Sequence, residues 1–93
     1  MRTIKRSSIF RRDYKREAKG QRRATLDGDL TPILSALAND ISLDAKHRDH
    51  ALSGEWSGFR ECHIKPDLLL IYRKPDDEIL QLARLGSHSE LFG

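Results

Sequence analysis

Four histidines lie at positions 47, 50, 63 and 88 of this 93-residue chain, and the first 46 residues contain none. Histidine has an ordinary pKa of about 6.5, so its side chain can take up or release a proton near neutral pH. Cleavage of RNA without a metal ion needs a base for the 2′-hydroxyl proton, a cation beside the phosphorus and an acid for the leaving 5′-oxygen. Histidines, one arginine and one carboxylate supply these groups, and the candidate catalytic residues are His50, His63, Asp67, Arg84 and His88.

A metal site is the competing interpretation of the same region. His47 and His50 are three positions apart, and Cys62 adjoins His63, so four potential ligands are present. However, adjacent residues of a strand point to opposite faces, which prevents Cys62 and His63 from binding one ion. The sequence also lacks the Cys-x-x-Cys and His-Glu-x-x-His spacings of zinc sites. We therefore predict no metal and no other cofactor. The spacing of these residues, taken alone, favours a third interpretation, in which the histidines lie on the surface without a function and Cys62 is buried and inert.

Basic residues are concentrated in the first quarter of the chain. Residues 1–24 hold ten Lys and Arg against two acidic residues, and the remainder holds seven against twelve, within a net charge of +3. This asymmetry favours a surface that binds a polyanion, and nucleic acid is the partner that it predicts. The alternative is a solvated helix face that only keeps the protein dissolved.

Three features bear on where the protein acts. A single cysteine excludes an internal disulfide, which points to the cytoplasm. No run of about 18 apolar residues is present, so we expect no membrane segment. The basic start of the chain is not followed by an apolar stretch, so we expect no secretory signal.

The first half of the chain predicts a strand and two helices. Residues 2–8 favour an edge strand, and residues 9–23 favour a basic amphipathic helix that Gly20 can end early. The packed face of this helix would carry Phe10, Tyr14 and Ala18.

A second helix is expected after residues 27–29. Asp29 or Thr31 would cap it, and Pro32 would lie in its first turn, where the missing N–H has no partner to lose. Its core-facing stripe would comprise Leu30, Ile33, Leu34, Leu37, Ala38 and Ile41.

The second half predicts a loop followed by three strands. Residues 42–58 show little periodicity, whereas residues 59–64, 68–72 and 79–85 are strand-like, and the apolar run 68–72 is typical of a central strand. We therefore predict a single α+β domain over residues 1–93, of order β-α-α-β-β-β, with an antiparallel sheet of about four strands and a helical hairpin on one face. A turn at Lys65 and Pro66 would bring Asp67 close to His63.

A longer pattern adds a family resemblance. Residues 49–67 read DH-x-L-x-G-x-W-x-G-x-R-x-x-H-I-x-P-D, and residues 84–93 read RLGSHSELFG. Both segments resemble the YafQ family of bacterial type II toxins, within the RelE/ParE superfamily. The resemblance is dense from about residue 46 onward and looser in the helices. Leu68 departs from the pattern, because some relatives have Trp there, so nucleotide preference can differ.

The resemblance implies a β-α-α-β-β-β fold and cleavage of mRNA in the ribosomal A site. It also implies neutralisation by an acidic, DNA-binding antitoxin encoded by the adjacent gene. On this resemblance the catalytic histidines are His50, His63 and His88, with Asp67 as the acidic residue and Arg84 as the cation. Phe92 would stack on a base.

Further residues have predicted roles in binding. We expect Lys15, Arg16 and Lys19 to bind ribosomal RNA, and Arg60 to be either a structural or a phosphate-contacting cation. We expect Trp56 to anchor a loop to the core.

The C-terminal residues are expected to form one helical turn. His88 and Phe92 are four positions apart, which places them on one side of that turn, and Leu91 would anchor it to the sheet.

Two other functions remain open from the sequence. A ParE-like gyrase-inhibiting toxin would share the fold without needing the His, Asp and Arg set. A non-enzymatic nucleic-acid-binding module would use only the basic helix.

Overall fold

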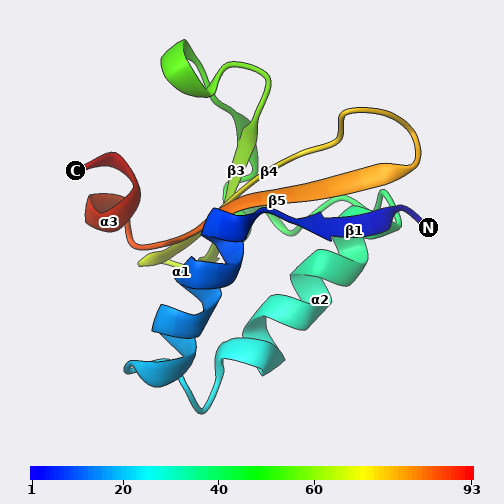
Figure 1. Ribbon diagram of the computed structural model, residues 1–93. Coiled ribbons are helices and arrows are strands. Elements are labelled where there is room, and N and C mark those ends of the chain that lie inside the picture. Colours follow the sequence, from blue (N-terminus) through cyan, green and yellow to red (C-terminus); the bar gives the residue numbers. More distant parts are fainter.

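A five-stranded sheet forms the centre of the computed structural model, which describes all 93 residues. The strands are arranged in the order β1-β5-β4-β3-β2 (Figure 1). Their bounds are Thr3–Arg6 for β1, His50–Ala51 for β2, Arg60–Lys65 for β3, Leu68–Arg73 for β4 and Ile79–Gly86 for β5. The α+β class is confirmed, and the strand count exceeds the expected four because the presumed loop contains the two-residue strand β2.

Two helices cover one face of the sheet, and a third lies at the C-terminal end (Figure 1). Helix α1 spans Ser8–Lys19, α2 spans Leu26–Ala38 and α3 spans His88–Phe92, and two short 3-10 turns occupy Ala45–His47 and Gly54–Trp56. We call the side covered by α1 and α2 the helix face. It holds the main core, in which Phe10, Leu30 and Leu37 pack against Leu70, Leu80 and other strand residues.

The direction of β1 differs from the expectation of a fully antiparallel sheet. β1 runs parallel to β5, with Thr3 opposite Ile79 and Arg6 opposite Leu82, whereas the other pairs are antiparallel. A parallel pair needs a long crossover connection, and α1 and α2 lie within the segment that joins β1 to the rest of the sheet. Residue periodicity reports burial and not strand direction, so this part of the prediction was wrong.

Helix α1 begins and ends where its sequence favours. The Ser7 side chain caps it by accepting a 2.9 Å bond from the Phe10 amide, and the helix stops before Gly20 as predicted. Phe10 is buried, and Tyr14 and Ala18 pack against the core.

Helix α2 starts earlier than predicted. Its first residue is Leu26, which is buried, and its cap residue Thr25 makes no side-chain capping bond, so the expected caps Asp29 and Thr31 lie inside the helix. Pro32 also lies inside rather than in the first turn.

The end of α2 also differs from the prediction. The helix ends at Ala38, and Asp40 adopts a left-handed backbone with φ 57°, which turns the chain. Ile41 is therefore 60% exposed and not part of the core, contrary to the predicted stripe.

The second face of the sheet, which we call the α3 face, has a smaller core. Leu69 and Ile71 of β4 pack there against Leu91 of α3, so β4 is buried on both sides as its continuous apolar run predicted. Trp56 and Phe59 cover the same cluster with their rings edge to face, 5.2 Å apart. Trp56 is therefore the loop anchor that was expected.

None of the helices has the length and apolar character needed to cross a membrane.

Candidate active site

The strand register places three polar residues, with the apolar Ile71 among them, in one row across the α3 face. His50 of β2 lies opposite Glu61 of β3, Glu61 lies opposite Ile71 of β4, and Ile71 lies opposite Arg84 of β5. Strands are about 4.8 Å apart, so this row spans about 14 Å. His63 is two residues beyond Glu61 on the same strand, and alternate residues share a face. The register thus brings two of the predicted histidines to one face, with Arg84 at the far end of the row.

Glu61 lies between the two histidines. Its Oε1 is 3.8 Å from Nε2 of His50 and 3.6 Å from Nε2 of His63, and its side chain is only 8% exposed. A buried carboxylate beside two imidazoles stabilises whichever ring carries the proton. Sequence reasoning missed Glu61, although its position two residues before His63 in a strand was the signal that could have found it.

The ring of His50 is held in one tautomer. Its Nδ1 lies 2.6 Å from the carbonyl oxygen of Arg48, and a carbonyl only accepts, so Nδ1 carries the hydrogen. In the neutral ring, the lone pair is therefore on Nε2, the nitrogen beside Glu61. A lone pair on a ring nitrogen is what a general base needs in order to accept a proton. His47 does not join this cluster, since its Nδ1 lies 2.6 Å from the backbone oxygen of His63.

Helix α3 brings a third histidine to the edge of the same face. Leu91 is buried against Leu69 and Ile71, which confirms its predicted anchoring role. On the outer side of the turn, His88 and Phe92 have ring centroids 5.0 Å apart, and both residues are exposed. Their placement on one side of a single turn is also confirmed, and both rings are open to a ligand.

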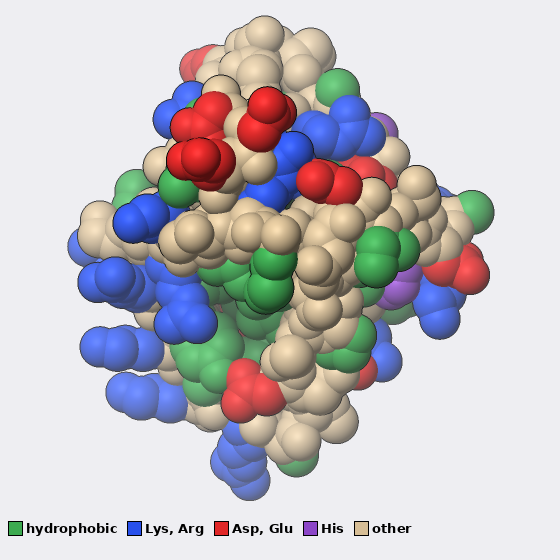
Figure 2. All heavy atoms as spheres, turned by 90° about the vertical axis from the view of Figure 1, so that its right-hand side faces the viewer, with side chains coloured by type: hydrophobic (Ala, Val, Ile, Leu, Met, Phe, Trp, Pro, Cys, Tyr) green, Lys and Arg blue, Asp and Glu red, His purple; other side chains and the backbone are tan.

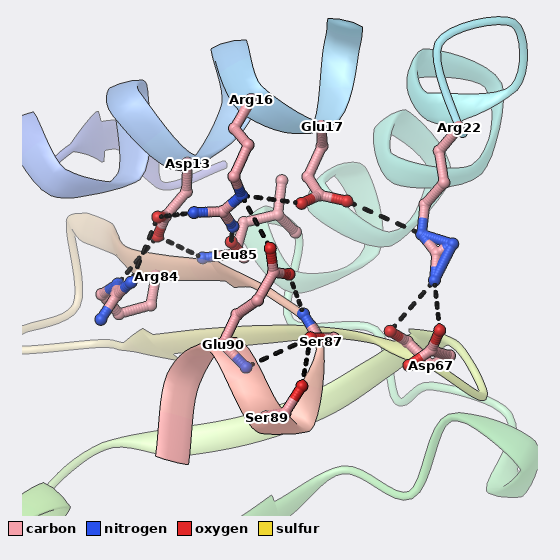
Figure 3. Close-up of polar contacts among 10 residues, drawn as sticks. All are labelled: Asp13, Arg16, Glu17, Arg22, Asp67, Arg84, Leu85, Ser87, Ser89 and Glu90. Carbon is pink, nitrogen blue, oxygen red and sulfur yellow. Dashed lines mark hydrogen bonds and ion pairs between the residues drawn. The ribbon is translucent and has the colours of Figure 1, made fainter. Parts of the chain in front are cut away.

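Arg84 turns from the end of the row toward helix α1, where it binds Asp13 (Figure 3). Its Nε lies 2.8 Å from Oδ2 of Asp13 and its Nη2 lies 3.2 Å from Oδ1, while the arginine side chain stays 23% exposed. Burial would raise the pKa of Asp13, but the bonds from Arg84 and from the Leu85 amide outweigh it, and the pKa lies below the ordinary 3.8. The guanidinium is thereby fixed in place with one side still facing solvent.

Asp67 lies in the turn that joins β3 to β4, where the sequence predicted a turn at Lys65 and Pro66. No polar contact joins Asp67 to His63, and the register shifts between His63 and Lys65, which disrupts regular pairing before the turn. The Asp67 carboxylate is 78% exposed and instead accepts a 3.1 Å bond from Arg22, between α1 and α2 (Figure 3).

Arg60 lies on the opposite side of the sheet from Glu61. It pairs with Tyr72 across the strands, and Tyr72 belongs to the main core of the helix face. The Nε of Arg60 donates a 3.2 Å bond to Asp49, which also accepts a 2.6 Å bond from the Tyr72 hydroxyl. Burial and this bond raise the pKa of Tyr72. These contacts tie the segment before β2 to the sheet and favour the structural role of Arg60.

Two of the three predicted RNA-binding residues of α1 are free, and one is engaged. Lys15 and Lys19 are exposed and form no ion pair or side-chain hydrogen bond, as is also true of Arg11 and Arg12. Arg16, in contrast, forms ion pairs with three carboxylates. The helix therefore presents a basic surface, which we define as Arg11, Arg12, Lys15 and Lys19.

Cys62 is fully buried in the main core, on the face opposite to His63. Burial raises the pKa of its thiol to about 12, so at neutral pH it stays protonated and unreactive. No group of three or more His, Cys, Asp or Glu side chains is arranged to hold a metal ion.

A groove of about 420 Å³ lies between α1 and α2. Its floor is apolar, and one rim is basic, as Figure 2 shows for the hollow on this side of the molecule. Its lining residues include Phe10, Leu30 and Leu34 on the floor and Arg6, Arg11 and Lys15 at the rim.

The fold and this arrangement of residues define a toxin of a bacterial type II toxin-antitoxin system. The sequence matches the family described as bacterial toxin of type II toxin-antitoxin system, YafQ, over residues 2–93, and the chain belongs to that family.

Individual relatives cover nearly the whole chain. The mRNA interferase toxin YafQ of Escherichia coli is 36% identical over 92 residues, which are 97% of this chain and 99% of the relative. The E. coli DinJ-YafQ toxin-antitoxin complex contains a chain with a TM-score of 0.83 and 35% identity, covering 99% of this chain and 98% of that one. A metal-bound toxin from Helicobacter pylori has a TM-score of 0.81 and 42% identity, and the match covers 99% of this chain and 100% of that one.

Proposed function

We propose that this toxin is an endoribonuclease that cleaves mRNA in the ribosomal A site by acid–base chemistry of its own side chains. The observation that carries the proposal is the position of Glu61 between His50 and His63, on the sheet face that α3 borders with His88. The mRNA interferase activity named for the E. coli relative supports the same reaction class.

Each step of the reaction has a residue suited to it. Nε2 of His50, backed by Glu61, takes the proton of the 2′-hydroxyl, and His63 shares this task because it contacts the same carboxylate. The 2′-oxygen attacks phosphorus, the bond to the 5′-oxygen breaks, and His88 protonates the leaving oxygen. Arg84, fixed by Asp13 but partly exposed, stabilises the charge on phosphorus.

Two residues would orient the substrate around these groups. Phe92 stacks on a base beside the scissile bond, since it is 40% exposed next to His88. Asp67 would orient the substrate through the carboxylate oxygen that Arg22 leaves free, because its side chain is largely exposed. None of these roles requires a metal ion or another cofactor.

The ribosome would be held through the basic surface of α1. Its four exposed cations lack acidic partners in the protein, so ribosomal phosphates can bind them without breaking an existing ion pair. Arg16 does not belong to this contact. A toxin that acts on ribosomes acts in the cytoplasm.

The partner that silences the toxin would be a cognate antitoxin encoded by the adjacent gene. The groove between α1 and α2 combines an apolar floor with a basic rim, which suits an acidic amphipathic segment (Figure 2). The E. coli relative forms a toxin-antitoxin complex with DinJ.

The test measures cleavage of a defined mRNA by the purified toxin, once on programmed ribosomes and once as free RNA. A separate assay measures whether the toxin inhibits supercoiling by gyrase. We expect cleavage only with ribosomes, and its loss in the double variant His50→Ala, His63→Ala. Inhibition of gyrase without RNA cleavage would replace the proposal with a ParE-like function. Binding to ribosomes with neither activity would leave a non-enzymatic module.

A further inference from the structure

Arg16 is the most heavily bonded cation of the molecule, and one of its contacts lies on α3 (Figure 3). Its Nε is 3.0 Å from Oε2 of Glu90 and its Nη2 donates a 2.9 Å bond to the carbonyl oxygen of Leu85. The same guanidinium also contacts Asp13 and Glu17 of its own helix, at 3.0 and 3.1 Å. A single side chain of α1 therefore connects the N-terminal helix to both the end of β5 and the C-terminal helix.

Glu90 receives this contact while it also caps α3. Its Oε1 accepts a 2.8 Å bond from the Ser87 amide, and its own amide donates a 3.2 Å bond to the Ser87 hydroxyl, which together form a capping box. The bond from Ser87, together with the charge of Arg16, holds the pKa of Glu90 below its ordinary value of 4.5. One oxygen thus closes the start of the helix, and the other binds Arg16.

Gly86 gives an independent sign that this contact is built into the fold. A Cβ atom at position 86 would lie 2.7 Å from Nη2 of Arg16, 3.1 Å from Oε1 of Glu90 and 3.3 Å from Cδ2 of Leu91. A side chain at this position would therefore displace the tip of Arg16 and crowd Glu90 and Leu91, so the glycine leaves room for the guanidinium and α3 beside the backbone at the end of β5.

Helix α3 depends on such contacts because it has only five residues. Isolated helices of that length do not form in water, so tertiary contacts must order it. Leu91 supplies an apolar contact to the sheet, which fixes the distance of the turn from the α3 face. The ion pair of Arg16 with Glu90 attaches a second point of the turn to α1, and two separate points of attachment limit how the turn can rotate on the sheet.

We propose that Arg16 is a positioning residue for cleavage: it orients α3 through Glu90 and so places His88 and Phe92 beside the substrate, instead of binding RNA itself. This inference rests on the proposed function for its consequence in catalysis. It assigns adjacent residues of α1 to different tasks, since Lys15 lines the groove and is free whereas Arg16 faces β5 and α3.

The experiment compares Arg16→Gln and Lys15→Gln in the full chain. Amide hydrogen exchange of Leu91 and Gly93, whose amides bond to the carbonyls of Ser87 and Ser89, reports the order of α3 without RNA. We expect Arg16→Gln to lower their protection about 10-fold relative to core amides of β4. The same variant should cleave ribosome-bound mRNA about 10-fold more slowly at saturating ribosome concentration, with unchanged ribosome affinity. Lys15→Gln should have the opposite effects: its affinity for ribosomes should be weaker, while the amides of α3 should stay fully protected from exchange.

Two further variants keep the inference testable if Arg16→Gln does not fold. Glu90→Gln removes the ion pair but keeps an amide oxygen for the cap, and Gly86→Ala obstructs the contact while Arg16 is intact. Both should reproduce the loss of protection and the slower cleavage.

Different outcomes overturn different statements. Unchanged protection of Leu91 and Gly93 in Arg16→Gln or Glu90→Gln would show that Arg16 does not hold α3. Lower ribosome affinity with α3 fully protected would make Arg16 an RNA contact after all. Failure of the unsubstituted toxin to cleave RNA would refute the proposed function, while the exchange measurement would still decide whether Arg16 orders α3.

Discussion

Substitution of Asp13 by Asn tests how strongly the buried charge network stabilises the fold. Asp13 is 2% exposed and accepts bonds from the Arg84 and Arg16 guanidinium groups and from the amide of Leu85. β1 pairs with β5 only as far as Leu82, so the backbone of Leu85 has no neighbouring strand on that side. Two side chains of α1 take the place of that strand: Asp13 accepts a bond from the Leu85 amide, and Arg16 donates one to the Leu85 carbonyl oxygen. Asn has the same shape but no charge; its oxygen can still accept from the donors on one side, while its NH2 group would face the donors on the other.

The expected cost follows from the exposure of the partners. Removing one member of a buried ion pair costs about 3–5 kcal/mol, but Arg84 and Arg16 are 23% and 42% exposed, so water recovers part of the loss. Whichever way the Asn side chain is turned, its NH2 group replaces one of the two accepting oxygens of the buried carboxylate, and the donors on that side lose their acceptor, which costs about 1–3 kcal/mol. We expect the free energy of unfolding to fall by about 2–3 kcal/mol. For a domain of this size, that change lowers the melting temperature by about 10–20 °C.

The assay is urea unfolding at a series of pH values. Because the pKa of Asp13 lies below its ordinary 3.8, its carboxylate stabilises the fold fully above that value. This stabilisation is lost as the pH falls through the lowered pKa. The difference between the unsubstituted protein and Asp13→Asn should therefore be constant at pH 5–7 and shrink below about pH 4. The control is Asp77→Asn, at an exposed carboxylate with no ion pair or hydrogen bond, which should change little. A loss below 1 kcal/mol at pH 7, or one independent of pH, would refute this account of the network.

Four further outcomes test the site. His88→Ala should slow cleavage about 10²-fold or more with little change in melting temperature, and Phe92→Ala should cost less and alter positioning on the codon; a fully active His88→Ala protein would remove His88 from the mechanism. Glu61→Gln should slow cleavage about 10-fold without weakening ribosome binding, because a neutral amide does not stabilise an imidazolium; unchanged rates would make the contact incidental. Reversal of Lys15 and Lys19 to Glu should weaken ribosome association and flatten its salt dependence while the fold is retained, and an unchanged salt slope would leave the helix a solvated face. Cleavage should survive EDTA, and activity lost on chelation and restored by Zn²⁺ would contradict the metal-free mechanism.

Local patterns predicted much of this fold because they depend on neighbours in the chain. The apolar run 68–72 predicted a strand buried on both faces. The end of α1 before Gly20 was predicted from the preference of glycine for positions where helices end. The spacing of His88 and Phe92 predicted one helical turn for the same reason.

The remaining features depend on contacts between distant segments. Glu61 and Asp13 resemble ordinary surface carboxylates in the sequence, and only the register of β3 with β2 and the docking of α1 on β5 show them to be buried and partnered. Arg16 likewise resembled its neighbour Lys15 until the position of α3 was known. The turn before Asp67 was predictable from local sequence, whereas the bond of Asp67 to Arg22 was not, because Arg22 belongs to a distant segment.

The parallel pairing of β1 with β5 determines when this protein can fold during its synthesis. Thr3 pairs with Ile79, 76 positions further along the chain, and closing a loop of that length costs about 4 kcal/mol of chain entropy. Because β5 also contributes Leu80, Leu82 and Leu85 to the main core, a growing chain that lacks β5 has neither a closed sheet nor a complete interior. The toxin therefore stays unfolded, and so inactive, until most of its sequence has emerged during synthesis, and a chain interrupted before residue 79 lacks β5 and does not complete the fold.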